Sequence, residues 1–314
     1  MGKEDNNNST PERKVVSLDD YRERIGSPEL EKQRLISEAA SREPDEAQKL
    51  RSFVEPEAEV EKIAKSWMKR LRGLQETSTR INRLFYGLQE STEEMGALFE
   101  YVSGRLGHSL CRTLYLDFLR LMSGAREISY EIREKLYMHA RERKMPLLRV
   151  LALQSQSYST TEAPHPSLVA DFASMDPELH EVSLGRRKAL ARTASMDLVQ
   201  RLSRDPDPRV IQILLCHPKL TEKELIKIAS RRPASPAALS EVIHHERWGA
   251  RPSVQEAIAL NPYSPAGLAA ALLPMLPSKV RKQVLTGLNA QPLVRAVAEA
   301  LEGDSSSLDT MLNR

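Results

Sequence analysis

The segment HHERW, residues 244–248, comes closest in residue type and spacing to a metal-binding motif. Two histidine ligands on one face of a helix need a spacing of four, whereas His244 and His245 are adjacent. His244 and Glu246 are two positions apart, and side chains with that spacing point in different directions on a helix. We therefore predict a solvated turn that binds no metal, in which Trp248 is the residue that could contact a partner.

Cysteine chemistry is a second possibility, because Cys216 directly precedes His217 and a thiol beside an imidazole can act as a nucleophile. The only other cysteine is Cys111, so the sequence supports neither a disulfide framework nor a cysteine metal site. The alignment of internal repeats given below makes Cys216 equivalent to Leu260, and we predict that both cysteines are buried and structural. The glycines form neither GxGxxG nor a P-loop. The sequence therefore predicts no enzyme and no cofactor.

Three lysines, Lys219, Lys223 and Lys227, are spaced by four, which would align them on one stripe of a helix. Such a stripe can bind an acidic surface or, alternatively, the phosphates of a nucleic acid, in which case binding weakens with salt. Acidic residues are interleaved with these lysines, and aromatic residues that could stack on bases are nearly absent nearby. The pattern favours a solvated face over a nucleic-acid groove. If these lysines bind a partner, we predict a protein contact and keep nucleic-acid binding as the alternative.

Amphipathic helices account for residues 58–153, which we predict to form an all-helical bundle. Apolar residues recur there at spacings of three and four, as expected for helices with one buried face. The connections are short, so consecutive helices should be antiparallel neighbours. The predicted core positions are Val60, Ile63, Trp67, Leu71, Leu74, Ile81, Leu84, Phe85, Leu88, Met95, Leu98, Phe99, Val102, Leu110, Leu114, Phe118, Leu121, Ile128, Ile132 and Leu136.

Two local features of this bundle can be read from the sequence. Ser91 can cap the helix that follows it, and Glu94 can complete a capping box. The helix around Trp67 has a basic outer face and could lie on an anionic membrane. Its apolar stripe continues the pattern of the following helices, so docking within the bundle is the simpler interpretation.

Residues 1–57 are acidic and lack a lasting apolar face, so we predict a disordered tail. Within it, residues 14–25 form an apolar island, KVVSLDDYRERI, which resembles segments near the starts of bacterial proteins. The island is either a transiently structured piece of tail or a short motif that folds on a partner. In the second case its contact residues would be Val15, Val16, Leu18 and Tyr21.

The second half of the chain contains a degenerate repeat of about 22 residues, assigned to residues 167–302 after a linker at 154–166. RVIQILLCHPKLTEKELIKIA aligns with SVQEAIALNPYSPAGLAAALL, so that His217-Pro218 matches Asn261-Pro262. Because proline inside a helix costs about 3 kcal/mol, the prolines should mark the ends of short helices. We predict four to five helix-turn-helix units, followed by a C-terminal tail at residues 303–314.

The Asn-Pro or His-Pro turn with flanking Val and Leu resembles the leucine-rich repeat variant and HEAT-like α-solenoid families over about residues 183–302. The resemblance implies paired helices stacked into a superhelix whose concave face binds another macromolecule. Some leucine-rich repeat variant proteins carry an iron-sulfur cluster held by clustered cysteines. The two distant cysteines of this chain exclude that property here.

The predicted fold is therefore all-α, with a disordered N-terminal tail, a helical bundle and a HEAT-like α-solenoid. The net charge of +3, the absence of a long apolar run and the low cysteine content indicate a cytoplasmic protein without a transmembrane segment. We expect a non-catalytic scaffold or adaptor that binds another protein, with nucleic-acid binding as the alternative.

Overall fold

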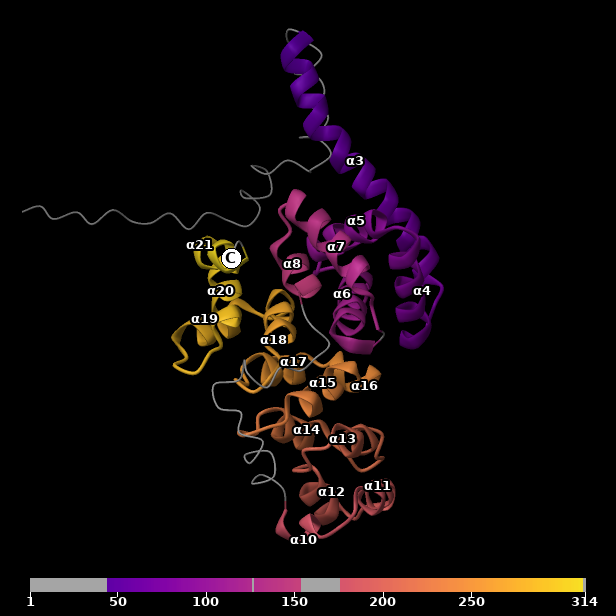
Figure 1. Ribbon diagram of the computed structural model, residues 1–314, viewed down its shortest axis with the longest axis vertical. Coiled ribbons are helices and arrows are strands. Elements are labelled where there is room, and N and C mark those ends of the chain that lie inside the picture. Colours follow the sequence, from indigo (N-terminus) through magenta and orange to yellow (C-terminus); the bar gives the residue numbers. More distant parts are fainter. Residues whose placement is uncertain (1–43, 126, 154–175, 313–314) are drawn as a thin grey trace, which may run out of the picture. The chain divides into compact units, whose positions relative to one another are not determined.

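The computed structural model describes residues 44–125, 127–153 and 176–312, and these residues form helices and turns without a β-strand (Figure 1). The prediction of an all-helical fold is confirmed for this part of the chain. The island at 14–25, with Val15, Val16, Leu18 and Tyr21, lies outside the described residues, and so does the linker at 154–166. The described residues from Val60 onward form one compact unit.

Helix α3, Pro44–Arg72, begins before the predicted start of the bundle at residue 58. Proline suits a helix start, because its missing N–H costs no hydrogen bond at the first helical position. The last turn carries Lys69, Arg70 and Arg72, which suit the negative end. The helix therefore extends through residues 44–57, which the sequence assigns to the tail because they lack a lasting apolar face.

The remaining bundle helices follow the predicted order, and their apolar faces form the predicted core. The positions from Trp67 to Leu136 named above are buried, apart from a few that pack against the core from its edge, such as Phe85 and Leu110. The helices are α4 (Thr77–Glu90), α5 (Thr92–Ser103), α6 (Ser109–Arg120), α7 (Tyr130–Glu142) and α8 (Pro146–Leu153), with a π-helical turn η1 (Leu121–Ala125) after α6.

The start of α5 confirms one half of the predicted capping box and corrects the other. The hydroxyl of Ser91 accepts a hydrogen bond from the backbone N–H of Glu94 at 3.2 Å. The Glu94 carboxylate instead accepts from the indole Nε1 of Trp67 at 2.7 Å. A buried indole needs an acceptor, so Glu94 satisfies the largest buried side chain of α3 rather than its own helix start.

Short helices separated by turns make up the region from residue 176 onward, here called the repeat region. They are α10 (Pro177–His180), α11 (Leu184–Thr193), α12 (Met196–Leu202), α13 (Pro208–Leu215), α14 (Glu222–Ala229), α15 (Pro236–His244), α16 (Glu246–Gly249), α17 (Pro252–Ala259), α18 (Ala266–Leu272), η2 (Leu273–Met275), α19 (Ser278–Thr286), α20 (Pro292–Leu301) and α21 (Ser306–Leu312).

Prolines mark the boundaries of these helices. Proline stands at the first turn of α10, α13, α15, α17 and α20, where its missing N–H costs no intrahelical hydrogen bond. The helices pack against others that are not always next along the chain: α13 contacts α11 and α15, α14 contacts α17, and α18 contacts α20. These short helices therefore bury their apolar faces against one another.

The side-chain amides of Asn261 and Gln291 donate hydrogen bonds to backbone carbonyls of other turns in the repeat region. Asn261, in the turn between α17 and α18, donates from Nδ2 to the carbonyls of Ala229 and Arg231 at 2.7 and 2.9 Å. Gln291, before α20, donates from Nε2 to the carbonyls of Pro262 and Ser264 at 2.5 and 2.7 Å. These bonds satisfy buried backbone acceptors at helix ends and fix the spacing of the turns.

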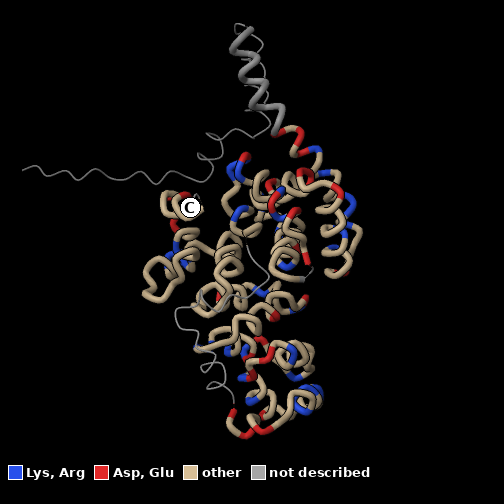
Figure 2. Tube along the Cα trace, viewed as in Figure 1, with Lys and Arg blue, Asp and Glu red and all other residues tan. Residues whose placement is uncertain are grey.

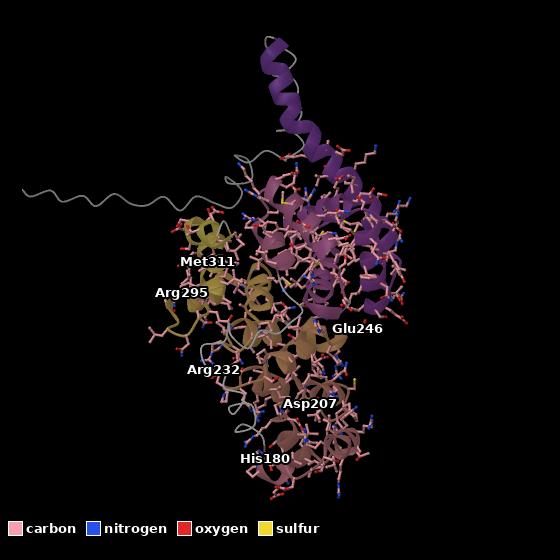
Figure 3. The ribbon with its side chains drawn as sticks, in the orientation of Figure 1. His180, Asp207, Arg232, Glu246, Arg295 and Met311 are labelled. Atoms are coloured by element: carbon pink, nitrogen blue, oxygen red, sulfur yellow. The ribbon has the colours of Figure 1, made fainter. Side chains whose placement is uncertain are left out.

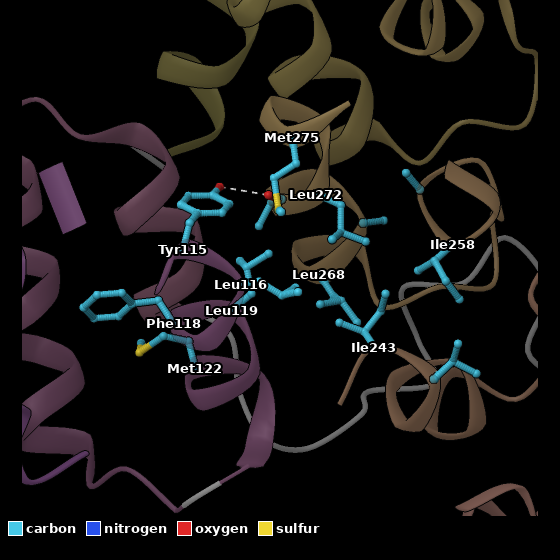
Figure 4. Close-up of a cluster of buried hydrophobic side chains, with 14 of the residues drawn as sticks. Tyr115, Leu116, Phe118, Leu119, Met122, Ile243, Ile258, Leu268, Leu272 and Met275 are labelled. Atoms are coloured by element: carbon cyan, nitrogen blue, oxygen red, sulfur yellow. Dashed lines mark hydrogen bonds between the residues drawn. The ribbon is translucent and has the colours of Figure 1, made fainter. Parts of the chain in front are cut away.

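The bundle and the repeat region share one apolar core (Figure 4). The hydroxyl of Tyr115, on α6, donates to the carbonyl of Ala271 on α18 at 2.8 Å. Burial raises the pKa of this phenol, so it stays protonated and keeps that bond. From α6, Tyr115, Leu116 and Leu119 point toward Leu268 and Leu272 of α18. Phe118 and Met122 point back into the bundle, where the ring of Phe118 packs edge-on against Phe99. Ile243 of α15, Ile258 of α17 and Met275 of η2 complete the cluster on the side of the repeat region.

The predicted C-terminal tail at 303–314 is wrong for residues 306–312, which form α21. Leu308 and Leu312 share one face of this helix and are buried. Arg149 of α8 donates to the carbonyl of Leu312 at 2.6 Å, and so does the hydroxyl of Tyr137 at 3.2 Å. The spacing of four between the two leucines is compatible with a helix. Two apolar positions are too few, however, to distinguish a short helix from an unstructured tail on the sequence alone.

Candidate binding site

The segment 244–248 is not the solvated turn that the sequence predicts. The ring Nε2 of His244 lies 2.8 Å from the hydroxyl of Ser123 on η1. Burial, and secondarily the charge of Arg120, lowers the pKa of His244 to about 4. Trp248 is 1% exposed and donates from Nε1 to the carbonyl of Leu215 at 2.8 Å. The predicted partner contact through Trp248 is wrong, because this side chain fills the core between α13 and α16.

An ionic network with a buried centre and an exposed edge at Glu246 holds this segment against the bundle. We call it the arginine joint; its members are Thr77, Arg80, Asp117, Arg120, Ser123, His244 and Glu246. Asp117 accepts from Arg80 at 2.6 Å and from Arg120 at 3.2 Å. Burial raises the pKa of Asp117, and the hydrogen bond and charge of Arg80 oppose that shift. All three side chains are less than one-tenth exposed, so the pairing compensates for the loss of water.

Arg120 also reaches the repeat region. Its guanidinium donates to the carbonyls of Ile243, His245 and Glu246 at 2.9, 3.2 and 3.3 Å. Thr77 donates from its hydroxyl to the Glu246 carboxylate at 2.8 Å. The joint therefore caps the end of α15 with a cation, which is favourable at that end of a helix dipole. Sequence reasoning missed it, although Asp117 and Arg120 interrupt an otherwise apolar face at a spacing of three.

Cys216 is exposed, and the prediction that it is buried is wrong, whereas Cys111 is buried as predicted. The residue caps the C-terminus of α13 instead of facing inward, and its equivalent Leu260, at the end of α17, is only half-buried. The thiol lies 3.7 Å from Nε2 of His245. A nucleophilic pair needs a third group to orient the imidazole, and Nδ1 of His245 has no hydrogen-bond partner within the described residues.

Two further site types are absent from the described part of the chain. Among residues 44–125, 127–153 and 176–312, no three His, Cys, Asp or Glu side chains come together to hold a metal ion. Over the same residues, no helix combines the length and apolarity that crossing a bilayer requires.

The predicted stripe of three lysines is only partly present. Helix α14 begins at Glu222 behind the N-cap Thr221, so Lys219 lies in the preceding turn and not on the helix. Lys223 and Lys227 do lie on α14, one turn apart and both exposed. The N-cap at Thr221 fixes the start of the helix after Lys219, because the threonine hydroxyl satisfies a free backbone N–H. The spacing of the lysines provides no such hydrogen bond and does not determine where the helix begins.

Lys227 lines a pocket of about 210 Å³ between the end of α12, the turn before α14 and α14 itself. Val199 and Leu220, both buried, supply its apolar part. Arg204 and Arg231 supply two further cations. We call this the cationic pocket; its lining residues are Val199, Gln200, Ser203, Arg204, Leu220, Glu224, Lys227 and Arg231.

Arg231 lacks a carboxylate partner within the described residues. It donates to the carbonyl of Ser203 at 2.5 Å and to the Ser203 hydroxyl at 3.2 Å. Burial lowers the pKa of its guanidinium, and the charge of Arg204 lowers it further. The one carboxylate that lines the pocket, Glu224, accepts from Thr221 and lies 3.6 Å from Lys227. A second negative charge in the pocket would therefore relieve repulsion between the two guanidinium groups.

Protein-family models, curated protein sequences and solved structures contain no match to this chain.

Proposed function

We propose that this chain is a non-catalytic, protein-binding scaffold whose repeat region is an α-solenoid of the HEAT-like or leucine-rich repeat variant type. The cationic pocket receives an aspartate or glutamate side chain of the partner. The observation that carries the proposal is Arg231, a partly desolvated guanidinium that faces Arg204 and has no described carboxylate partner. A partner carboxylate would supply the missing charge and accept hydrogen bonds in the bidentate geometry that arginine favours.

Nucleic-acid binding is the alternative class, and the observations favour it less. Figure 2 shows acidic and basic residues interleaved along the bundle and the repeat region. None of the described residues that line the cationic pocket is aromatic, so no base can stack there. The pocket is thus suited to a single acidic group rather than to a phosphate backbone.

The first experiment selects peptides from a random library on the full chain and measures their affinity by fluorescence anisotropy. Selected peptides should be rich in Asp or Glu. The double variant Arg204→Gln, Lys227→Gln should weaken them at least 10-fold, because it removes two of the three cations. The double variant Lys219→Gln, Lys223→Gln is the matched control, since it changes the net charge equally at exposed positions outside the pocket.

Equal losses for the two double variants would show that only net charge matters, and the pocket would not be the site. Neutral selected peptides would overturn the acidic preference. Tight binding of a DNA or RNA oligonucleotide, lost in the pocket variant, would overturn protein binding in favour of the alternative. Measurements at two salt concentrations separate these outcomes, because phosphate contacts give the steeper salt dependence.

We further propose that the island at 14–25 is a second, tethered contact that increases avidity for a multivalent partner. Two free cysteines suit the reducing cytoplasm that we assign to the protein. The truncation that tests the island should remove residues 1–43, because α3 begins at Pro44. Partner recovery in a pull-down from the full chain should fall on truncation, and unchanged recovery of every partner would exclude a role for the island.

A further inference from the structure

The cationic pocket carries more positive charge than one carboxylate can neutralise. Arg204, Lys227 and Arg231 line it, against a single carboxylate, that of Glu224. Glu224 lies 3.6 Å from Lys227, so these two charges compensate each other. The guanidinium groups of Arg204 and Arg231 then remain, and the lining as a whole has a net charge of +2.

Three aspartates near Arg204 in sequence or in space each pair with another arginine. The pairs are Asp176 with Arg201 at 2.9 Å, Asp205 with Arg187 at 2.7 Å and Asp207 with Arg209 at 2.7 Å. The hydrogen bond from Arg201 is the main cause that lowers the pKa of Asp176, and the charge of Arg204 adds to that shift. Arg204 is exposed, and within the described residues it has no carboxylate at 4.0 Å or less. Its charge is therefore available to a ligand.

Arg231 is held in position by Ser203, the residue that precedes Arg204. In Figure 3, the labelled Asp207 and Arg232 mark the chain shortly after Arg204 and directly after Arg231. The bonds of Arg231 to the carbonyl and the hydroxyl of Ser203 use two of the five N–H groups of its guanidinium and leave the others for a ligand. Because this guanidinium is already ordered, it loses less conformational entropy when a ligand binds.

A phosphomonoester matches this charge better than a carboxylate does. A carboxylate has one negative charge and two oxygens, which suffice to pair with one guanidinium in bidentate geometry. A phosphorylated serine or threonine has a charge of about −1.5 to −2 at pH 7 and three acceptor oxygens, which suffice for both guanidinium groups. Each phosphate of a nucleic-acid backbone has only one negative charge. Sites for drug-sized ligands occupy about 300–1,000 Å³, so a pocket of about 210 Å³ favours a single side chain over a nucleotide.

We propose that the cationic pocket binds a phosphoserine or phosphothreonine side chain of the partner protein in preference to aspartate or glutamate. Arg204 and Arg231 donate to the phosphate oxygens, while Lys227 remains paired with Glu224. A carboxylate binds the same pocket more weakly, because it leaves one guanidinium without a counter-charge. This assignment rests on the proposed protein-binding function and adds the chemical group that the pocket selects. Partner binding then depends on phosphorylation of the partner.

The test titrates small anions into the isotope-labelled full chain and follows the side-chain N–H signals of Arg204 and Arg231 in NMR spectra. The probes are N-acetyl-phosphoserine N-methylamide, N-acetyl-glutamate N-methylamide and inorganic phosphate. At about pH 7.5 the phosphoserine probe should bind about 10-fold more tightly than the glutamate probe, because it carries the second charge. It should also bind about 3-fold more tightly than inorganic phosphate, which has no stem to contact the apolar lining, Val199 and Leu220.

The pH dependence isolates the second charge of the phosphate. At about pH 5 the phosphate carries a single negative charge, because its second pKa is about 6, whereas the glutamate carboxyl, with a pKa of about 4.3, keeps its charge. None of the described residues that line the pocket is a histidine, and any change in the charge of the pocket acts on both probes. The preference for the phosphoserine probe should therefore fall to about 3-fold or less.

Arg204→Gln tests the second guanidinium, and the fold should be retained because this residue is exposed. At about pH 7.5 the preference of this variant for the phosphoserine probe should be about 3-fold or less, since only Arg231 remains uncompensated. Lys223→Gln is the matched control, because Lys223 is an exposed residue of α14 outside the pocket, and the preference should stay unchanged.

Equal affinities of the phosphoserine and glutamate probes, or a preference that persists at the lower pH or in Arg204→Gln, would overturn this assignment and leave the proposed function standing. Equal binding of inorganic phosphate would also overturn it, because the pocket would then recognise the free anion. Binding of the phosphoserine probe without the glutamate probe would support the phosphate site and refute the aspartate or glutamate specificity of the proposed function. Absence of saturable binding by every probe would refute both.

Discussion

Arg120 in the arginine joint and Arg231 in the cationic pocket are both withdrawn from water, yet their surroundings differ. Arg120 pairs with Asp117 and donates to three carbonyls of the repeat region. Arg231 donates only to Ser203, and its nearest charged influence is another cation, Arg204. Burial lowers the pKa of both guanidinium groups, but a charge partner opposes that shift only at Arg120. We infer that the paired arginine holds the fold together and that the unpaired one is available to a ligand.

The first test of this difference removes the negative charge of Asp117, which compensates the buried arginines of the arginine joint. Asp117→Asn should leave Arg80 and Arg120 buried without a counter-charge, and we expect a loss of about 3–5 kcal/mol in the free energy of unfolding. Urea denaturation measures it. Asp207→Asn is the control, because its partner Arg209 is 61% exposed and such pairs contribute about 1 kcal/mol or less. Similar losses for both variants would contradict a special role for the joint.

The pH dependence of stability is a second test of the arginine joint, through its buried His244. The pKa of His244 is about 4 in the folded chain and 6.5 when unperturbed, so the unfolded chain binds more protons between these values. Stability should therefore fall as the pH drops from 6.5 to 4, by about 3 kcal/mol from this residue. Subtracting the profile of His244→Gln isolates the contribution, since carboxyl groups in the same chain also change stability with pH. Parallel profiles would contradict the burial of His244 as a neutral ring.

A close backbone approach at the joint gives a third test. A Cβ at Gly249 would lie 2.0 Å from the carbonyl oxygen of Ile243 and 3.0 Å from Nη2 of Arg120. Gly249→Ala should therefore push α16 away from the end of α15 and cost about 1–3 kcal/mol in a denaturation experiment. At Gly185 in α11 nothing lies within 4 Å of the added Cβ, so Gly185→Ala should instead stabilise by up to about 1 kcal/mol. A stable Gly249→Ala variant would show that the joint is loosely packed.

The two regions also differ in how much of them the sequence predicts. Apolar periodicity located the bundle core from Trp67 to Leu136, because burial of one helix face leaves a regular pattern. It could not locate the arginine joint, since only the tertiary fold brings Asp117 to Arg80 and Arg120 to the carbonyls of Ile243, His245 and Glu246. The lysine spacing led to Lys227 but not to Arg204, which follows the end of α12, nor to Arg231, which follows the end of α14. Cys216 was misplaced because a repeat alignment does not show which residue leaves the helix at its C-cap.

The smallest expected effect belongs to the cationic pocket, and it tests the comparison directly. Arg231→Met removes a half-buried guanidinium without stranding a carboxylate, so the stability of the free chain should change by no more than about 1 kcal/mol. Inorganic phosphate should raise the Tm of the unaltered chain more than that of Arg231→Met at equal ionic strength, because an anion that binds only the folded state stabilises it. General salt effects on folding are the same for both chains and cancel in the difference. Arg120→Met provides the contrast, with a loss of several kcal/mol and no phosphate effect of its own. If Arg231→Met lost as much stability as Arg120→Met, Arg231 would be a second structural arginine, and the absence of a carboxylate partner would not mark a binding site.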